Sequence, residues 1–205
     1  MNIWRPATDR LSPLPMQGGI TGHGLVCRRG DRLLWGPVDL AVHPGQALQL
    51  AGPNGIGKTS LLRIVAGLLR PFVGIVERRG SIALLDAAVA LDEDQPLGRA
   101  LGFWRRLDRG VMPLERLGLD ALAEVPVRYL STGQRKRAGL ARLIGQGADI
   151  WLLDEPLNGL DTSGVALVEE LVAEFRMAGG AVLLASHQPI ALPGATVLDL
   201  RAHPS

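Results

Sequence analysis

The sequence has very little cysteine, few aromatic residues and no long apolar segment. Cys27 is the single cysteine of the 205 residues. No second cysteine or histidine stands at the spacing of a metal-binding or haem-attachment motif, so we expect a small buried thiol. Apolar runs such as residues 82–91 include Asp86 and are much shorter than the roughly 20 residues needed to cross a bilayer. The sequence therefore predicts neither an internal disulfide nor a membrane-spanning helix.

The sequence also lacks a strong charge of either sign. Its net charge is +2, and its basic residues form short clusters such as Arg135-Lys136-Arg137. Nucleic-acid-binding proteins instead carry long basic stripes with interleaved aromatic residues. Apolar residues make up 47% of the chain and charged residues 20%, which is typical of globular domains. We therefore expect one globular unit and no nucleic-acid partner.

The N-terminal residues differ in composition from the rest of the chain. Residues 1–19 contain three prolines and two glycines without any period, which predicts a loosely ordered leader. They lack the apolar core of a secretory signal, so we expect the chain to stay in the cytoplasm. Translation could begin at Met1 or at Met16, and residues 20–205 are predicted to form a single domain.

Apolar periodicity predicts alternating strands and helices within that domain. Short strands are expected between residues 25 and 50, and a helical, arginine-rich stretch at 97–122 predicts a small helical subdomain over about residues 96–140. The remaining predicted elements are strands at 81–85, 150–153 and 181–185 and helices at 58–69, 135–144 and 163–177. Because the strands are apolar throughout, we predict an α/β fold with a parallel sheet covered on both faces.

The first motif with chemical meaning is a glycine-rich loop that follows a predicted strand and opens a predicted helix. Its residues are Gly52-Pro53-Asn54-Gly55-Ile56-Gly57-Lys58-Thr59, followed by Ser60. The glycines let backbone N–H groups point into one concavity, and the helix N-terminus adds partial positive charge there. Lys58 supplies a point charge for the β- and γ-phosphates, and Thr59 supplies a hydroxyl for Mg²⁺. The loop therefore predicts a nucleoside triphosphate site.

The second motif is the apolar strand 150–153, which is followed directly by Asp154 and Glu155. Asp154 is placed to hold Mg²⁺ through its water shell, and Glu155 is placed to polarise the water that attacks the γ-phosphate. Two acids at this place could instead begin the next helix, since carboxylates favour helix N-termini. The phosphate loop in the same chain favours the catalytic interpretation.

The third motif is Leu130-Ser131-Thr132-Gly133-Gln134, immediately before a predicted helix. The hydroxyl of Ser131 and the N–H groups near Gly133 can face a phosphate, together with the dipole of the helix. Taken alone, this motif is explained equally well by an ordinary helix N-cap at Ser131 or Thr132.

The order of these motifs, followed by Gly159-Leu160-Asp161 and Ser186-His187, resembles the nucleotide-binding domains of ABC ATPases over residues 24–190. The resemblance implies a P-loop NTPase of ABC type with a small antiparallel β subdomain and a small helical subdomain. It also implies a head-to-tail homodimer that encloses two ATP molecules. In such a dimer the residues that close on the partner's nucleotide or cross the seam would be Ser131, Gly133, Gln134 and Asp161. The implied catalytic set is Lys58, Glu155 and His187.

Within this family the chain resembles in particular the ATP-binding subunits of haem exporters used in cytochrome c maturation. Residues 27–32, the phosphate loop with residues 60–71, and Thr132 carry that likeness. It implies a transport-coupled ATPase, peripheral to the cytoplasmic face of the cell membrane and bound to separate integral membrane permease subunits. The sequence leaves the cargo and the permease open, so an exporter of another cargo and an ABC ATPase without a permease stay as alternatives.

Two positions depart from the family pattern. Many ABC ATPases stack adenine on an aromatic residue where this chain has Arg28-Arg29, and a guanidinium can take over that role. The family also carries a glutamine that touches Mg²⁺ after the strand that follows the first helix. Here Ala87 or Ala88 stands at that place, unless Gln95 serves from further along the chain. We expect binding to survive, because a water can replace a neutral ligand of Mg²⁺.

Overall fold

The computed structural model describes residues 18–108 and 110–204 of the chain. The predicted leader over residues 1–19 lies outside the described residues except for Gly18 and Gly19, and Gly19 already begins the first strand. No helix in the described part of the chain has the length and apolar character needed to span a membrane.

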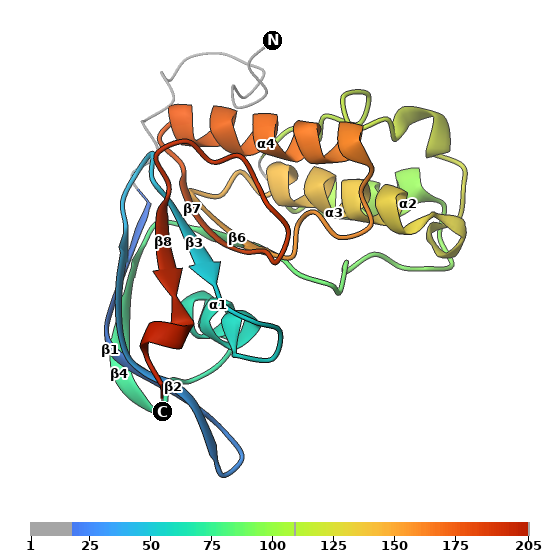
Figure 1. Ribbon diagram of the computed structural model, residues 1–205. Helices are drawn as coiled ribbons and strands as arrows, with labels where there is room; N and C mark the ends of the chain where they lie inside the picture. The colour runs from blue at the N-terminus through green and yellow to red at the C-terminus, as the bar shows by residue number, and fades with distance from the viewer. Residues whose placement is uncertain (1–17, 109, 205) are drawn as a thin grey trace.

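In the part of the chain that the structure describes, the strands form two sheets of different kinds (Figure 1). A three-stranded antiparallel sheet has the order β2-β1-β4, with β1 at Gly19–Arg29, β2 at Arg32–Val42 and β4 at Val73–Arg79. A five-stranded parallel sheet has the order β5-β6-β7-β3-β8. Its strands are β3 (Ala47–Ala51), β5 (Ile82–Leu85), β6 (Ile150–Asp154), β7 (Ala181–Ala185) and β8 (Thr196–Asp199).

Within residues 18–108 and 110–204, four α-helices and three short 3-10 helices complete the fold. The α-helices are α1 (Lys58–Ala66), α2 (Leu97–Arg105), α3 (Thr132–Gly145) and α4 (Thr162–Met177). The 3-10 helices are η1 (Asp120–Leu122), η2 (Val127–Tyr129) and η3 (Leu200–Ala202). The predicted α/β class, with an antiparallel β subdomain and a helical part, is thereby confirmed.

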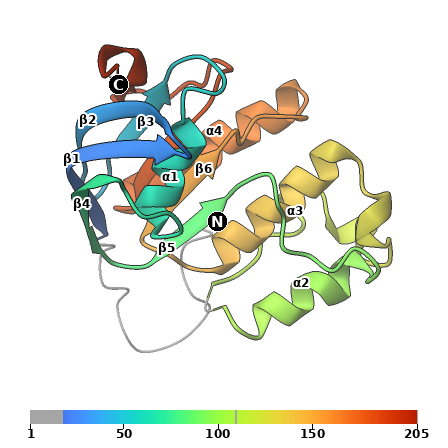
Figure 2. The ribbon, with the colours of Figure 1, turned by 90° about the horizontal axis from the view of Figure 1, so that it is seen from below.

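The two faces of the parallel sheet pack against different partners. Alternate side chains of a strand point to opposite faces, so Ile150 and Leu152 of β6 join the core around α1 and the antiparallel sheet. Trp151 and Leu153 join the second core, on the side of α3 and α4, and Trp151 stacks on Phe175 of α4 with ring centroids 4.0 Å apart. Helix α1 is therefore enclosed between the two sheets (Figure 2).

Residues 97–122 contain less helix than the sequence predicted. Helix α2 ends at Arg105, and residues 106–108 and 110–119 form only turns, a bend and irregular chain. This segment crosses the end of α3 so closely that the N–H of Gly110 donates to the carbonyl of Gly145 at 2.8 Å, and a Cβ at position 110 would lie 2.8 Å from a backbone oxygen. Packing across α3 therefore overrides the local helical preference.

Other boundaries shift for local reasons. Helix α1 stops at Ala66 because Gly67 adopts a left-handed C-cap with φ 79°, so the predicted end at residue 69 is wrong. Helix α3 begins three residues before the predicted Arg135, because Ser131 is its N-cap. Strands β4 and β8 were not expected, since β4 is largely exposed and β8 pairs only at the sheet edge.

Candidate nucleotide-binding and hydrolysis site

The phosphate loop connects β3 to α1 at the carboxyl edge of the parallel sheet. Gly52, Gly55 and Gly57 all have positive φ, at 134°, 80° and 110°, a region that glycine occupies without strain. Position 57 also admits no side chain, because a Cβ there would lie 2.5 Å from the indole nitrogen of Trp35. The loop conformation therefore depends on the glycines of the motif.

Lys58 is the most enclosed polar side chain of the loop. It is only 6% exposed, and its Nζ donates to the carbonyls of Gly52 at 2.7 Å and Pro53 at 3.2 Å. The loop thus curls around the ammonium. The side chain of Ile56 instead packs with the core next to α1, so at this predicted site residue only the backbone can face a phosphate.

Thr59 and Asp154 meet where α1 begins and β6 ends. Burial raises the pKa of the Asp154 carboxyl, and a hydrogen bond from Thr59 opposes that shift. A hydroxyl and a carboxylate are hard oxygen donors of the kind Mg²⁺ prefers. The two residues predicted to hold the metal therefore lie together and fit that ion.

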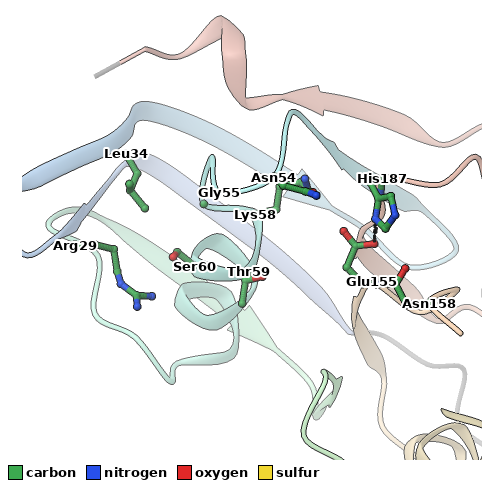
Figure 3. Close-up of a pocket in the computed structure, with 11 residues that line it drawn as sticks. Arg29, Leu34, Asn54, Gly55, Lys58, Thr59, Ser60, Glu155, Asn158 and His187 are labelled. Atoms are coloured by element: carbon green, nitrogen blue, oxygen red, sulfur yellow. Dashed lines mark hydrogen bonds and ion pairs between the residues drawn. The ribbon is translucent and has the colours of Figure 1, made fainter. Parts of the chain in front are cut away.

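Glu155 and His187 form a close pair just beyond the ends of their strands, one residue after β6 and two residues after β7. Glu155 Oε2 lies 2.7 Å from Nδ1 of His187 and also accepts the backbone N–H of His187 at 3.3 Å. Figure 3 shows this pair at one end of the site, beside Asn158. Because β6 and β7 are parallel neighbours, their carboxyl ends bring together two residues 32 positions apart.

One cavity of about 540 Å³ is lined by half of the predicted site residues. The predicted residues that line it are Asn54, Gly55, Gly57, Lys58, Thr59, Ser60, Glu155 and His187. Asn158 also lines it and was not predicted as a site residue. Its place between Asp154-Glu155 and Asp161, two motifs already assigned to the site, is the signal that could have found it.

Arg29 and Leu34 lie at the opposite end of this cavity from the Glu155–His187 pair (Figure 3). Arg28 points elsewhere, with its guanidinium 4.2 Å from the ring centre of Phe72. Successive side chains of a strand face opposite ways, so only one of the two adjacent arginines can reach the site. The sequence left that choice open, and Leu34 was missed because it belongs to another strand.

The third motif lies outside the main cavity. Ser131 caps α3: its Oγ accepts the N–H of Gln134 at 3.2 Å, and the Gln134 side chain accepts the N–H of Ser131 at 2.9 Å. Gly133 approaches the carbonyl of Gly159 so closely that a Cβ would lie 2.9 Å from it. Asp161 caps α4 by accepting the N–H of Gly164 at 2.8 Å. Within one chain these four residues do not line the cavity that contains Lys58.

A second cavity, of about 380 Å³, is lined by one of the two alanines expected at the glutamine position. Ala87 lines it together with Thr59, Asp154 and Lys136. Gln95 lies in a different groove, beside Arg99 and Trp104 of α2. The cavity that holds the candidate metal ligands is therefore lined by the methyl group of Ala87 and not by Gln95.

A phosphate loop at the edge of a parallel sheet, with an acidic pair on the neighbouring strand, defines a P-loop nucleoside triphosphatase. The family described as ABC transporter matches residues 36–158. A relative from Novosphingobium aromaticivorans named cytochrome c biogenesis ATP-binding export protein CcmA is 55% identical, over 89% of this chain and 96% of its own length. A protein of the same name from Sphingopyxis alaskensis is 53% identical, over 83% and 90%.

The chain belongs to the ABC transporter family, and it is a transport-coupled ATPase subunit that binds ATP. A solved structure described as a putative ABC transporter (ATP-binding protein) from Pyrococcus furiosus shares the fold. Its TM-score is 0.77 at 21% identity, and the match covers 91% of this chain and 100% of that one. The predicted family is thus confirmed, and so is the ABC type of the fold.

Proposed function

We propose that this chain hydrolyses Mg²⁺-ATP to drive an export step in cytochrome c biogenesis, with haem as the cargo of the complex. The names of the relatives above, at 55% and 53% identity, support the pathway. The observation that carries the hydrolytic part is the Glu155–His187 pair, 2.7 Å apart in the same cavity as Lys58. A carboxylate held in this way is suited to accept a proton from water.

Each residue of the cavity has a distinct proposed role. The loop N–H groups and Lys58 hold the β- and γ-phosphates, while Thr59 and Asp154 supply oxygen ligands for Mg²⁺. The ion, when bound, neutralises charge on the phosphate oxygens. Glu155 takes the proton of the attacking water, a general-base contribution of about 10²–10⁴ in rate, and His187 orients that carboxylate and faces the γ-phosphate.

We also propose that the complete site needs a second copy of the chain. Ser131 and Gly133 lie at the N-terminus of α3, where the helix dipole favours an anion, yet they lie outside the cavity that contains Lys58. Family membership supports a dimer in which these residues, with Gln134 and the loop at Asp161, close on the partner's ATP. The dimer would attach to integral membrane permease subunits and so lie peripherally on the cytoplasmic face of the membrane.

The dimer and the catalytic role of Glu155 are tested by one variant. Glu155→Gln keeps the size and hydrogen-bonding capacity of the side chain but removes the base, so ATP is expected to accumulate a stable dimer without turnover. Light scattering in Mg²⁺-ATP should then show twice the monomer mass. Lys58→Ala is the control, because it weakens phosphate binding and should remain monomeric. A Glu155→Gln protein that stays monomeric with ATP bound contradicts the shared site.

The cargo is tested in cells depleted of the chain. Holocytochrome c is expected to fall while apocytochrome synthesis continues, and wild-type protein should restore it where Glu155→Gln protein does not. Normal haem attachment in depleted cells would favour an exporter of another cargo. Recovery of the chain from cytosol, without any membrane protein, would favour an ABC ATPase that has no permease.

A further inference from the structure

Lysine is rare in this chain, and both lysines lie at the candidate site. Of the 22 lysine and arginine residues only Lys58 and Lys136 are lysines. Lys58 belongs to the phosphate loop, and Lys136, near the start of α3, lines the smaller cavity with Thr59 and Asp154. An ammonium is a compact charge with three donors, whereas a guanidinium is a planar fork. The second lysine therefore brings a compact positive charge to the cavity lined by Thr59 and Asp154.

Lys136 contacts the backbone of the proposed general base. Its Nζ donates to the carbonyl oxygen of Glu155 at 3.1 Å. The side chain is partly buried, and the carboxylates of Asp154, Asp86 and Glu155 all act on it. Burial lowers the pKa of Lys136, and these three carboxylates oppose that shift. The cation is thus enclosed at the acidic edge of the sheet.

The backbone of Glu155 is unusual in a way that makes this contact important. Across residues 18–108 and 110–204, Glu155 is the one non-glycine residue with a positive φ, at 49°. Such a conformation is strained and persists only where the surrounding contacts hold it. Its N–H donates to the carbonyl of Ala185 at 2.8 Å, and its carboxylate contacts His187. Both of those contacts come from the β7 side, whereas Lys136 holds the opposite end of the residue from α3.

We propose that Lys136 is a positioning residue for ATP hydrolysis, because its ammonium fixes the Glu155 carbonyl and so keeps the carboxylate beside His187. The proposal rests on the proposed role of Glu155 as the base. Helix α3 begins at the Ser131 cap, the surface proposed to contact the partner's ATP. Lys136 therefore also links that surface to the catalytic carboxylate of its own subunit.

The test compares Lys136→Met with Lys136→Arg in steady-state ATP hydrolysis. Methionine fills similar space without charge or donors, so kcat should fall by about 10- to 100-fold, as for the loss of supporting contacts at other sites. KM for ATP should change by less than about threefold, because the phosphate loop is intact. Arginine should restore most of kcat. Arg105→Met, which removes an exposed cation at the end of α2, is the control and should match the wild type.

A double-mutant cycle separates positioning from a general loss of structure. In a Glu155→Gln background there is no carboxylate to position, so adding Lys136→Met should change the single-turnover rate by less than about twofold. All rates are expressed per ATP-binding site, so that unfolded protein does not count. An equal fall in both backgrounds, or an unchanged kcat in Lys136→Met, would overturn the proposal. If Glu155→Gln alone hydrolyses ATP like the wild type, the proposed role of Glu155 fails instead, so the two failures are distinguishable.

Discussion

The left-handed backbone of Glu155 predicts an inverted order of stability between two substitutions. At most sites glycine is less stable than alanine, because it loses more conformational freedom on folding. At φ 49° the Cβ of alanine retains the strain that glycine removes. We therefore expect Glu155→Gly to be more stable than Glu155→Ala, although both lose the carboxylate and neither should hydrolyse ATP.

The size of the difference follows from two opposing contributions. A residue with a Cβ in the left-handed region is disfavoured by about 1–2 kcal/mol, and the extra chain entropy of glycine opposes this by about 0.5–1 kcal/mol. The contact with His187 is lost in both variants and cancels. At the midpoints of these two ranges the net difference is about 0.75 kcal/mol in favour of glycine, and it corresponds to about 1.5–3 °C in Tm for a chain of this size.

The assay is thermal unfolding of the ligand-free protein, because bound nucleotide would shift the Tm by itself. The control compares Glu170→Gly with Glu170→Ala, because Glu170 lies inside helix α4 and its side chain is 66% exposed. There Gly should be less stable than Ala by about 1 kcal/mol. If Gly is also the less stable choice at position 155, the inferred backbone conformation of Glu155 is wrong.

Asp154→Asn should raise the Tm of the ligand-free protein at neutral pH, by at most about 2–4 °C. Burial raises the pKa of Asp154, so folding is less favourable while this carboxyl is ionised. The gain in Tm from Asn should therefore vanish as the pH falls below the pKa of the carboxyl in the unfolded chain. An unchanged Tm at pH 7 contradicts this prediction. Arg29→Ala should weaken ATP binding about two- to fivefold. Arg28→Ala should leave ATP binding unchanged, because the Arg28 side chain lies over Phe72. Equal effects of the two substitutions in a binding titration would refute this. Ala87→Gln should lower the Mg²⁺ concentration for half-maximal hydrolysis by less than about tenfold, and Ala88→Gln should leave it unchanged.

Local chemistry made much of this protein predictable. The phosphate loop needs glycines at defined positions, so the motif at residues 52–59 predicted a strand before it and a helix after it. Strands covered on both faces must be apolar throughout, which is why β6 and β7 were found with nearly correct bounds. Asp154 and Glu155 follow such a strand directly, so their place at the sheet edge was also predictable.

Contacts between distant segments decided the rest. The end of α2 at Arg105 depends on a crossing over α3, and the choice between Arg28 and Arg29 depends on which face of β1 meets the cavity. Ala87 rather than Gln95 lies beside Asp154 because β5 ends next to β6.

By itself, the sequence determined the family, the phosphate loop and the acidic pair, because these depend on residue types at short spacings. Only the tertiary structure decided that Glu155 is left-handed, paired with His187 and held by Lys136. Those partners lie 32 and 19 positions away in the chain. No local pattern encodes such contacts, because they arise only when the parallel pairing of β6 with β7 and the packing of α3 bring the segments together.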